Sequence, residues 1–379
     1  MKWKAIRTIG YEQDYLDKLS KYMDIRPVGF ALGDNLLGED EMITALAGVD
    51  IFVVCYDVIT KRVIEGCPDL KLIASTRGGP EANIDIDAAT AVGIPVLYAA
   101  GRNAQAVAEY VVAFMLAMAR PLYESDRQTR EGILMDMGDS SRSRANGEVE
   151  LSTADRDVVW PLEPDTPAYQ AHQRLFGTEL YGKTLGVIGF GVIGQTVARV
   201  AQSFCMRILV YDPYMDQEEI AKHGAQSANL TSVMSQSDYI TLHARLTLGS
   251  VGMIGRNELR AMKPTACLIN TARAALVDED ALLEALREGW IRAAGLDVHH
   301  QEPIPLNHPI LSIDPERVIL SPHLAGSTKE VTSHHSILLT ETLSHYLEGK
   351  HLSRGLFNPQ VFENCNYANR GGLLFGSLK

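Results

Sequence analysis

The sequence of 379 residues has no long apolar run, no closely spaced cysteine pair and no excess of positive charge. Its longest apolar run, Val111 to Ala119, is too short to span a bilayer, and MKWKAIRTIGYEQDY at the start holds no apolar leader. The formal net charge of −12 opposes binding to a nucleic-acid backbone or to an anionic membrane surface. The five cysteines are widely spread, as in a reduced protein. We therefore expect a cytoplasmic protein without a nucleic-acid or membrane partner.

The length and the apolar rhythm indicate two α/β domains. A content of 46% hydrophobic and 22% charged residues is typical of globular proteins, and 379 residues exceed one ordinary core. Short apolar runs alternate with helix-like stretches, which predicts parallel sheets flanked by helices. The runs expected to be strands are Ile51–Cys55, Leu70–Ala74, Ile94–Tyr98, Thr184–Ile188, Ile208–Tyr211, Tyr239–His243, Cys267–Asn270, Ala293–Val298 and Val318–Ser321.

The chain changes character twice between these two series of strands. The stretch NAQAVAEYVVAFMLAMAR, which begins at Asn103, keeps apolar residues at helical spacing and predicts a long buried helix that connects the domains. Residues 136–165 are rich in Ser, Asp, Gly and Pro, so we expect an irregular insertion there. Its two candidate roles are an arm at an oligomer interface and a lid over an active site.

The motif with the most specific chemistry is GFGVIG. Gly189, Gly191 and Gly194 form a G-x-G-x-x-G pattern directly after the apolar run that ends at Ile188. Such glycines allow a tight turn and a close approach of the backbone to a pyrophosphate, whose charge a helix N-terminus stabilises. The next apolar run ends in Asp212, where a ribose-binding acid is expected. A carboxylate at that point repels the 2′-phosphate of NADP, so we expect NAD as the cofactor.

Three ionisable residues follow apolar strands in the second half of the chain: Arg273, Glu302 and His323. They can share one site, because the carboxyl ends of parallel strands meet at the same edge of a sheet. Hydride transfer to a keto acid needs a proton donor, a fixed cation for the carboxylate and an acid that orients the donor, and these residue types supply all three. Each also has an ordinary alternative: a surface charge, a solvated loop acid and a core histidine.

The stretch STRGGPEANID near residue 75 joins a cation to two glycines at a strand end. Gly78, Gly79 and Pro80 cannot continue a strand, so backbone N–H groups and the Arg77 guanidinium are presented together. This arrangement can bind a small anion, but the stretch by itself favours a surface turn whose arginine points into water.

Several motifs together resemble the D-isomer-specific 2-hydroxyacid dehydrogenases. These motifs are GFGVIG with Asp212, NTARAALVDEDAL, AGLDVHHQEP, SPHLAGST and NIDIDAATAVGIPVLYAAGRNAQAVAEY. The resemblance implies a substrate-binding domain of residues 1–101 plus 324–379 and an inserted NAD-binding Rossmann domain of residues 102–323. It also implies a homodimer that interconverts a D-2-hydroxy acid and its 2-keto acid by hydride transfer.

The same resemblance assigns roles to single residues. Arg273 is expected to bind the substrate, His323 to act as acid and base, and Glu302 to be its partner, while Asp297 is expected near the nicotinamide carboxamide. The full cofactor-binding set is Gly189, Gly191, Val192, Ile193, Asp212, His243, Thr271, Ala272, Arg273, Asp297 and His323, and the substrate-binding set is Arg77, Gly78, Gly79, Arg273 and His323.

Two departures from the family pattern raise hypotheses of their own. The loop STRGGPEANID is about one residue longer than the usual form and carries Arg77 where a small residue is common, so Arg77 is hypothesised to bind a phosphorylated or dicarboxylic substrate. The pair His299 and His300 suggests a metal, but no third ligand is suitably spaced, and we predict no metal site.

Two other classes share much of this pattern. Corepressors of the C-terminal-binding-protein type have the same fold and motifs but act mainly as NAD-sensing scaffolds, and they remain the alternative function. Formate dehydrogenases have glutamine at the position of Glu302, which disfavours them. We expect an NAD-dependent reductase of small 2-keto acids.

Overall fold

The structure is a computed structural model that describes residues 2–133, 167–352 and 354–369. The irregular insertion expected at about 136–165 lies outside the described residues.

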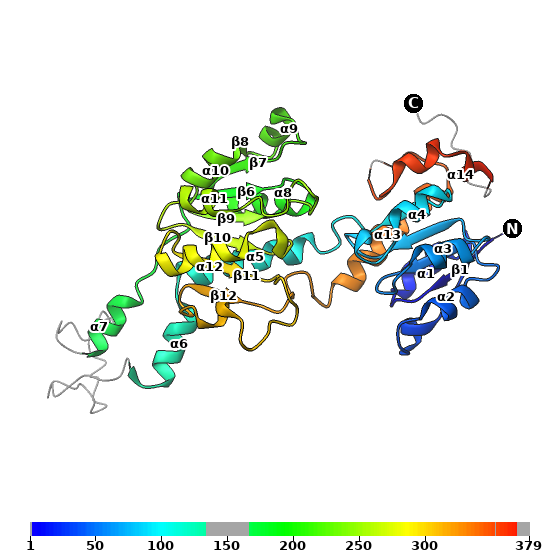
Figure 1. The fold of residues 1–379 in the computed structure, drawn as a ribbon. Coiled ribbons are helices and arrows are strands. Elements are labelled where there is room, and N and C mark those ends of the chain that lie inside the picture. Colours follow the sequence, from blue (N-terminus) through cyan, green and yellow to red (C-terminus); the bar gives the residue numbers. More distant parts are fainter. Residues whose placement is uncertain (1, 134–166, 353, 370–379) are drawn as a thin grey trace, which may run out of the picture. The chain divides into compact units, whose positions relative to one another are not determined.

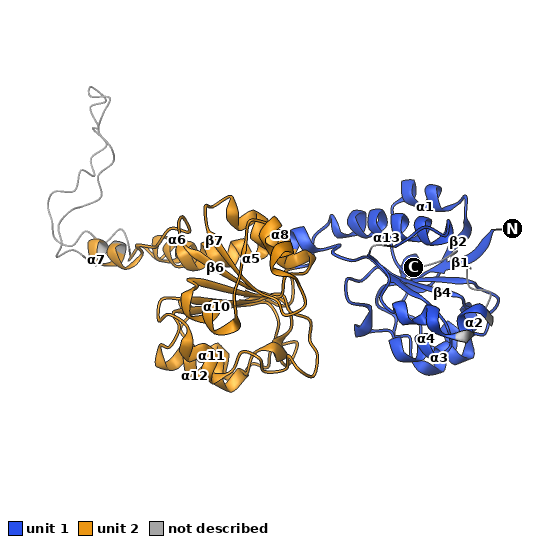
Figure 2. Ribbon diagram, turned by 90° about the horizontal axis from the view of Figure 1, so that it is seen from above, with its two compact units in different colours: residues 1–106, 326–379 blue, residues 107–325 orange. Residues whose placement is uncertain are grey.

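The chain divides into two compact units, which Figure 2 shows in different colours. Unit 1 comprises Met1–Ala106 and Gly326–Lys379, and unit 2 comprises Val107–Ala325. Each unit contains one parallel sheet flanked by helices (Figure 1). This confirms the α/β fold class that the sequence predicted.

Unit 1 has a five-stranded parallel sheet in the order β2-β1-β3-β4-β5. The short apolar runs become strands because both faces of the sheet are covered, so β3 (IFVV) and β4 (LIAS) are buried along their whole length. Phe52 and Val54 face a core with α2, α3 and α4, whereas Val53 faces a core with α1 and α13. The elements are β1 (Trp3–Arg7), α1 (Gln13–Leu19), β2 (Met23–Pro27), α2 (Glu39–Ala45), β3 (Ile51–Val54), α3 (Lys61–Gly66), β4 (Leu72–Ser75), α4 (Ile86–Ala91), β5 (Val96–Tyr98), α13 (Val331–Leu347) and α14 (Cys365–Asn369).

Unit 2 has a seven-stranded parallel sheet in the order β12-β11-β10-β9-β6-β7-β8. Helices α5 and α8 contribute to the core on one face, and α10, α11 and α12 contribute to the core on the other. The elements are α5 (Ala104–Ala119), α6 (Leu122–Arg130), α7 (Pro167–Arg174), β6 (Thr184–Ile188), α8 (Val192–Gln202), β7 (Arg207–Tyr211), α9 (Gln217–Lys222), β8 (Gln226–Ser227), α10 (Leu230–Gln236), β9 (Tyr239–Leu242), α11 (Arg256–Ala261), β10 (Cys267–Asn270), α12 (Glu279–Glu288), β11 (Ala293–Leu296) and β12 (Val318–Leu320).

The order of the strands in unit 2 reverses between β6 and β9. The chain runs outward from β6 through β7 to β8, then returns to β9 on the other side of β6 and continues outward to β12. In open α/β sheets, ligands bind at the carboxyl ends of the strands beside such a switch point. The topology therefore places the candidate site at the carboxyl ends of β6, β9, β10, β11 and β12.

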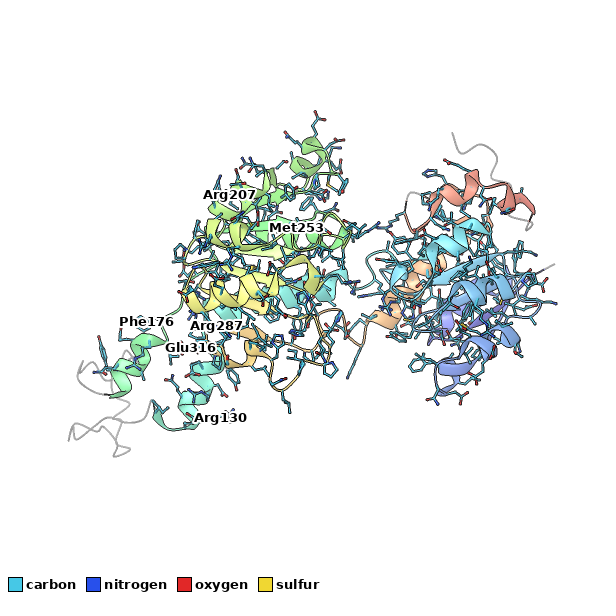
Figure 3. The ribbon with its side chains drawn as sticks, in the orientation of Figure 1. Arg130, Phe176, Arg207, Met253, Arg287 and Glu316 are labelled. Carbon is cyan, nitrogen blue, oxygen red and sulfur yellow. The ribbon has the colours of Figure 1, made fainter. Side chains whose placement is uncertain are left out.

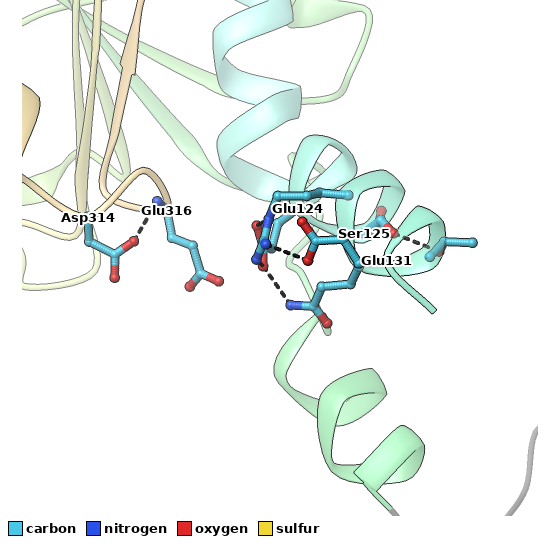
Figure 4. Close-up of polar contacts among 8 residues, drawn as sticks. Glu124, Ser125, Glu131, Asp314 and Glu316 are labelled. Atoms are coloured by element: carbon cyan, nitrogen blue, oxygen red, sulfur yellow. Dashed lines mark hydrogen bonds and ion pairs between the residues drawn. The ribbon is translucent and has the colours of Figure 1, made fainter. Parts of the chain in front are cut away.

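Helix α6 is stabilised by its own charges, because none of its residues is buried. Arg127 pairs with Glu124 one turn before it and with Glu131 one turn after it (Figure 4). Arg130 at the end of α6 and Phe176 after α7 are exposed, as is Arg287 on α12 (Figure 3).

Within the described residues no single helix is long and apolar enough to cross a membrane. The pair α5 and α6 meets that criterion only when the two are joined, and they are bent by 57° relative to each other.

Candidate active site

The glycine loop that follows β6 is shaped by contacts that exclude side chains. Gly189 has a φ of +88°, and a Cβ there would lie 2.5 Å from the nitrogen of Ala244. A Cβ on Gly194 would lie 2.3 Å from the carbonyl oxygen of Gly189, so this glycine allows α8 to begin against the loop. A Cβ on Gly191, in contrast, would meet no atom of the described residues within 4 Å. The protein itself therefore leaves Gly191 room that a pyrophosphate can use.

Asp212 lies at the carboxyl end of β7 and accepts two backbone hydrogen bonds. One comes from the nitrogen of Phe190 in the glycine loop, at 2.7 Å, and the other from the nitrogen of Tyr214, at 2.9 Å. These bonds hold the carboxylate beside the loop, and each oxygen keeps a lone pair that can accept a ribose hydroxyl. Val192, the first residue of α8, is 41% exposed next to this loop.

His243 and Thr271 follow neighbouring strands β9 and β10. The backbone of His243 lies against the glycine loop, since its carbonyl carbon is 2.6 Å from the position of a Cβ on Gly189. Burial lowers the pKa of His243 to about 3, so its ring is neutral at physiological pH, and its Nε2 lies 2.9 Å from the hydroxyl of Thr241. The buried hydroxyl of Thr271 has no hydrogen-bond partner in the described protein. An unpaired buried hydroxyl is costly, so it is an additional sign of a ligand at this edge.

The turn that carries Ala272 and Arg273 is held by the side chain of Asn270. Its amide oxygen accepts from the nitrogen of Ala272 at 3.1 Å, and its amide nitrogen donates to the carbonyl of Arg273 at 2.9 Å. The Arg273 guanidinium is exposed and donates to the carbonyl of Ala272 at 2.7 Å, with no ion pair to any described carboxylate. It can therefore bind an anionic ligand without breaking a protein ion pair.

Glu302 and His323, which are far apart in sequence, form a hydrogen-bonded pair. The Glu302 Oε2 lies 2.8 Å from His323 Nδ1, and its Oε1 accepts from the backbone nitrogen of His299 at 3.0 Å. Partial burial alone raises the pKa of Glu302, but the hydrogen bonds from His323 and His299 outweigh it and leave this pKa below its ordinary value. Because an ionised carboxylate only accepts, Nδ1 of His323 carries a proton and Nε2 remains for chemistry.

Asp297 supports the turn in which His323 lies. Its carboxylate is 1% exposed and accepts from the hydroxyl of Ser321 at 2.6 Å and from the nitrogens of Leu324 and Ala325 at 2.7 and 2.9 Å. Its carbonyl accepts from the nitrogen of His323 at 2.8 Å, and His323 has a φ of +56°, which is uncommon for a residue with a side chain. The strand expected over Ala293–Val298 ends at Leu296. The chain leaves the sheet at Asp297, whose carboxylate binds the turn that contains His323.

The expected anion loop lies in unit 1, after β4. Among the described residues, the nitrogens of Gly78 and Gly79 have no hydrogen-bond acceptor, and no carboxylate pairs with Arg77. The Arg77 guanidinium lies 5.9 Å from the centroid of the Tyr56 ring, and Phe30 meets that ring edge-on. A Cβ on Gly78 would make only ordinary contacts, the nearest at 3.8 Å, so protein packing does not explain this glycine.

Within unit 2 the structure brings several of the expected residues together. Glu302 contacts His323, while Arg273 and Asp297 follow adjacent strands at the same edge of unit 2. Sequence reasoning missed two features: the role of Asn270 in the turn, and the contact of His299 with the pair Glu302 and His323. The signal for Asn270 was an asparagine at the end of a buried strand, where its side chain can hold a turn. Within the described ranges no group of three or more His, Cys, Asp or Glu residues is placed to hold a metal.

Comparison with known proteins identifies the family of this chain. The family model described as D-isomer specific 2-hydroxyacid dehydrogenase, NAD binding domain, matches residues 160–325. A glyoxylate reductase of Korarchaeum cryptofilum is 36% identical over 306 residues, which are 80% of this chain and 81% of that protein. A D-3-phosphoglycerate dehydrogenase of Methanocaldococcus jannaschii is 35% identical over 316 residues, which are 83% of this chain and 53% of that protein.

A solved structure has a similar arrangement. It is an acyclic imino acid reductase in complex with NADPH and D-Arg, with a TM-score of 0.70 and 28% identity, and the match covers 94% of this chain and 100% of that one.

The class of the protein follows from three features: the parallel α/β fold, the glycine loop and the pair Glu302 and His323. Together they define a dinucleotide-dependent oxidoreductase. The chain belongs to the D-isomer specific 2-hydroxyacid dehydrogenase family. It is an NAD-dependent oxidoreductase that interconverts 2-hydroxy and 2-keto acids, and the scaffold alternative is not favoured.

Proposed function

We propose that the protein reduces a small 2-keto acid to the D-2-hydroxy acid, with His323 as the acid and base and Glu302 as its partner. The observation that carries this assignment is the 2.8 Å contact between Glu302 and His323 at the carboxyl edge of the sheet that also carries the glycine loop. Glyoxylate is the first substrate to test, because a glyoxylate reductase is among the relatives.

The chemistry of the pair follows from its geometry. The Glu302 carboxylate fixes the proton on Nδ1, so Nε2 is the atom that exchanges a proton with the keto oxygen. When bound, NADH supplies the hydride that the carbonyl carbon accepts. In the oxidation direction, Nε2 takes the proton back from the hydroxyl group. The two protonation states of one side chain therefore serve both directions.

We assign the cations to substrate binding. Arg273 binds the substrate carboxylate and polarises the keto oxygen, since its guanidinium is exposed and forms no ion pair with a described carboxylate. Gly78 and Gly79 donate backbone hydrogen bonds to an anionic group of the substrate, and Arg77 supplies charge for a second anionic group. Two observations support this assignment: these N–H groups have no acceptor among the described residues, and an aromatic ring lies beside Arg77.

The cofactor residues are proposed on the same basis. Asp212 accepts the adenosine ribose hydroxyls, the nitrogens at the start of α8 face the pyrophosphate, and Thr271 offers its free hydroxyl. We assign unit 2 to NAD binding and unit 1 to substrate binding.

We further propose that the protein is a cytoplasmic homodimer. Leu122, Tyr123 and Phe176 of unit 2 are 66%, 76% and 63% exposed, and a second copy that covered them would remove this apolar surface from water. Light scattering after size-exclusion chromatography tests the oligomeric state. A single species near twice the chain mass supports the homodimer, and a monomer at micromolar concentration contradicts it.

The decisive experiment measures NADH oxidation by the full chain with glyoxylate, hydroxypyruvate, pyruvate, 2-ketoglutarate, oxaloacetate and phosphohydroxypyruvate. We expect turnover of at least one acid, a loss of roughly 10²-fold or more in His323→Ala, and no change in His351→Ala, an exposed histidine elsewhere. Chiral chromatography of a chiral product then identifies the isomer. If NADH binds tightly but no acid is reduced, the proposed reaction is wrong.

A further inference from the structure

The consecutive histidines His299 and His300 have different surroundings. His300 is exposed, and its Nε2 lies 3.3 Å from the carbonyl of Val277. His299 is partly buried, and its Nε2 lies 2.8 Å from the carbonyl of Ser321. A carbonyl oxygen only accepts, so Nε2 of His299 carries a proton and donates it.

The carbonyl that His299 reaches belongs to the turn that presents His323. The oxygen of Ser321 also accepts from the backbone nitrogen of His323, at 3.1 Å. The hydroxyl of the same residue donates to Asp297. The His299 ring therefore binds Ser321, which precedes His323 by two residues in the same turn. His323 is the residue with the left-handed backbone conformation described above.

The backbone of His299 contacts the other member of the pair. Its nitrogen donates to Oε1 of Glu302 at 3.0 Å, while Oε2 of Glu302 binds His323. A closed ring of hydrogen bonds results: it runs from the backbone of His299 through Glu302 to His323, then through the backbone to Ser321 and back to the His299 ring. Because the side chains of Glu302 and His323 are 39% and 50% exposed, packing alone does not hold either of them.

We propose that His299 is a positioning residue of the proton-transfer pair, which ties the loop of Glu302 to the turn of His323. The proposal rests on the proposed function in that His323 must be the proton donor. Without the side-chain bond, the loop and the turn can separate, and the carboxylate no longer meets Nδ1 in every molecule. The His323 imidazole then no longer keeps one tautomer and one orientation. The glycine loop and the cofactor residues are unaffected.

The kinetic test compares four variants of the full-length protein. His299→Ala and His299→Phe remove the donor, and we expect kcat to fall about three- to tenfold, the range for losing one hydrogen bond, with the dissociation constant of NADH unchanged. His299→Gln keeps an N–H donor and should restore most of the rate. His300→Ala is the matched control and should behave as the wild type. Equal rates for His299→Phe and the wild type would overturn the proposal, as would a fall in all three His299 variants without rescue by glutamine.

A spectroscopic test needs no turnover, so it separates this proposal from the proposed function. In protein labelled with ¹⁵N-histidine and saturated with NADH, the Nδ1 proton between His323 and Glu302 gives a downfield imidazole signal, which His323→Ala identifies by its loss. We expect this signal to broaden or disappear in His299→Phe and to persist in His299→Gln and His300→Ala. An unchanged signal in His299→Phe contradicts the positioning role, even if no 2-keto acid is ever reduced.

Discussion

The charged groups at the carboxyl edges of the two sheets differ in whether the protein itself supplies their hydrogen-bond partners. In unit 2, Glu302 is already hydrogen-bonded to His323, and the Asp297 carboxylate accepts three protein hydrogen bonds. In unit 1, Arg77 lies against an aromatic ring without a carboxylate partner among the described residues, next to glycine N–H groups that have no acceptor. The difference separates two tasks: groups that move a proton are oriented by the protein in advance, whereas groups that bind an anion are completed only by the ligand.

The largest effect is expected when the negative charge of Glu302 is removed from its pair with His323. Glu302→Gln keeps the size of the side chain but loses the carboxylate that accepts from Nδ1 and holds the imidazole in one tautomer, so we expect kcat of keto-acid reduction to fall roughly 10²-fold. Glu316→Gln, an exposed glutamate in the connection between β11 and β12, is the control and should retain full activity. A rate for Glu302→Gln within threefold of the wild type would show that the pair is not the proton-transfer unit.

The next effect concerns the buried carboxylate of Asp297. Asp297→Ala leaves three donors of the turn without their acceptor, so we expect the free energy of unfolding to fall by about 2–4 kcal/mol in urea titrations. Asp297→Asn keeps one amide oxygen and should cost less. Unchanged stability together with weaker NADH binding would instead assign this carboxylate mainly to the cofactor.

A third change sharpens the role of charge beside the glycine loop. Asp212→Ser removes the carboxylate that repels a 2′-phosphate, and we expect the ratio of kcat/KM for NADPH over NADH to rise at least about tenfold. Steady-state rates with both cofactors provide the measurement. A ratio that stays constant would mean that Asp212 does not face the ribose.

The effect in unit 1 should depend on the substrate. Arg77→Ala should raise KM about tenfold for phosphorylated or dicarboxylic acids, which corresponds to about 1.4 kcal/mol, and change KM for glyoxylate little. Arg77→Lys keeps the positive charge and should lose less. If KM is unchanged for every acid, the anion-binding role of Arg77 is wrong, and the arginine only covers the Tyr56 ring.

The smallest expected effect is the pH dependence of stability. Because the pKa of Glu302 is lower in the folded protein than its ordinary value, its contribution is present above the pKa of the unfolded chain, about 4.3. It is lost as the pH falls from there through the lower folded value. Urea unfolding of the wild type and Glu302→Gln should therefore converge over this acidic range. A constant difference in free energy over the same range would show that the carboxylate is not stabilised by folding.

The sequence predicted the parts of the molecule that depend on neighbouring residues. Strands Thr184–Ile188 and Cys267–Asn270 have the bounds that their apolar runs indicated, and the glycine loop follows the first of them. Strands β1, β2 and β8 were not identified as such, because WKAIR and MDIRP mix polar and apolar residues and QS consists of two polar residues; all three strands lie at or beside the edge of a sheet. Their pairing with neighbouring strands, rather than their own composition, makes them strands.

Within the site, the residue types that follow each strand, and therefore the possible chemistry, could be predicted from the sequence. Their partners become known only in the folded protein: Glu302 with His323, the Asp297 carboxylate with the turn of Ser321, and the His299 ring with a carbonyl 22 residues away. The physical reason is that a hydrogen bond depends on distances of about 3 Å between groups on different loops, and no local pattern of residues specifies how two loops meet. Spacing along the chain suggested a metal-like histidine pair, whereas the fold gave the two rings different partners.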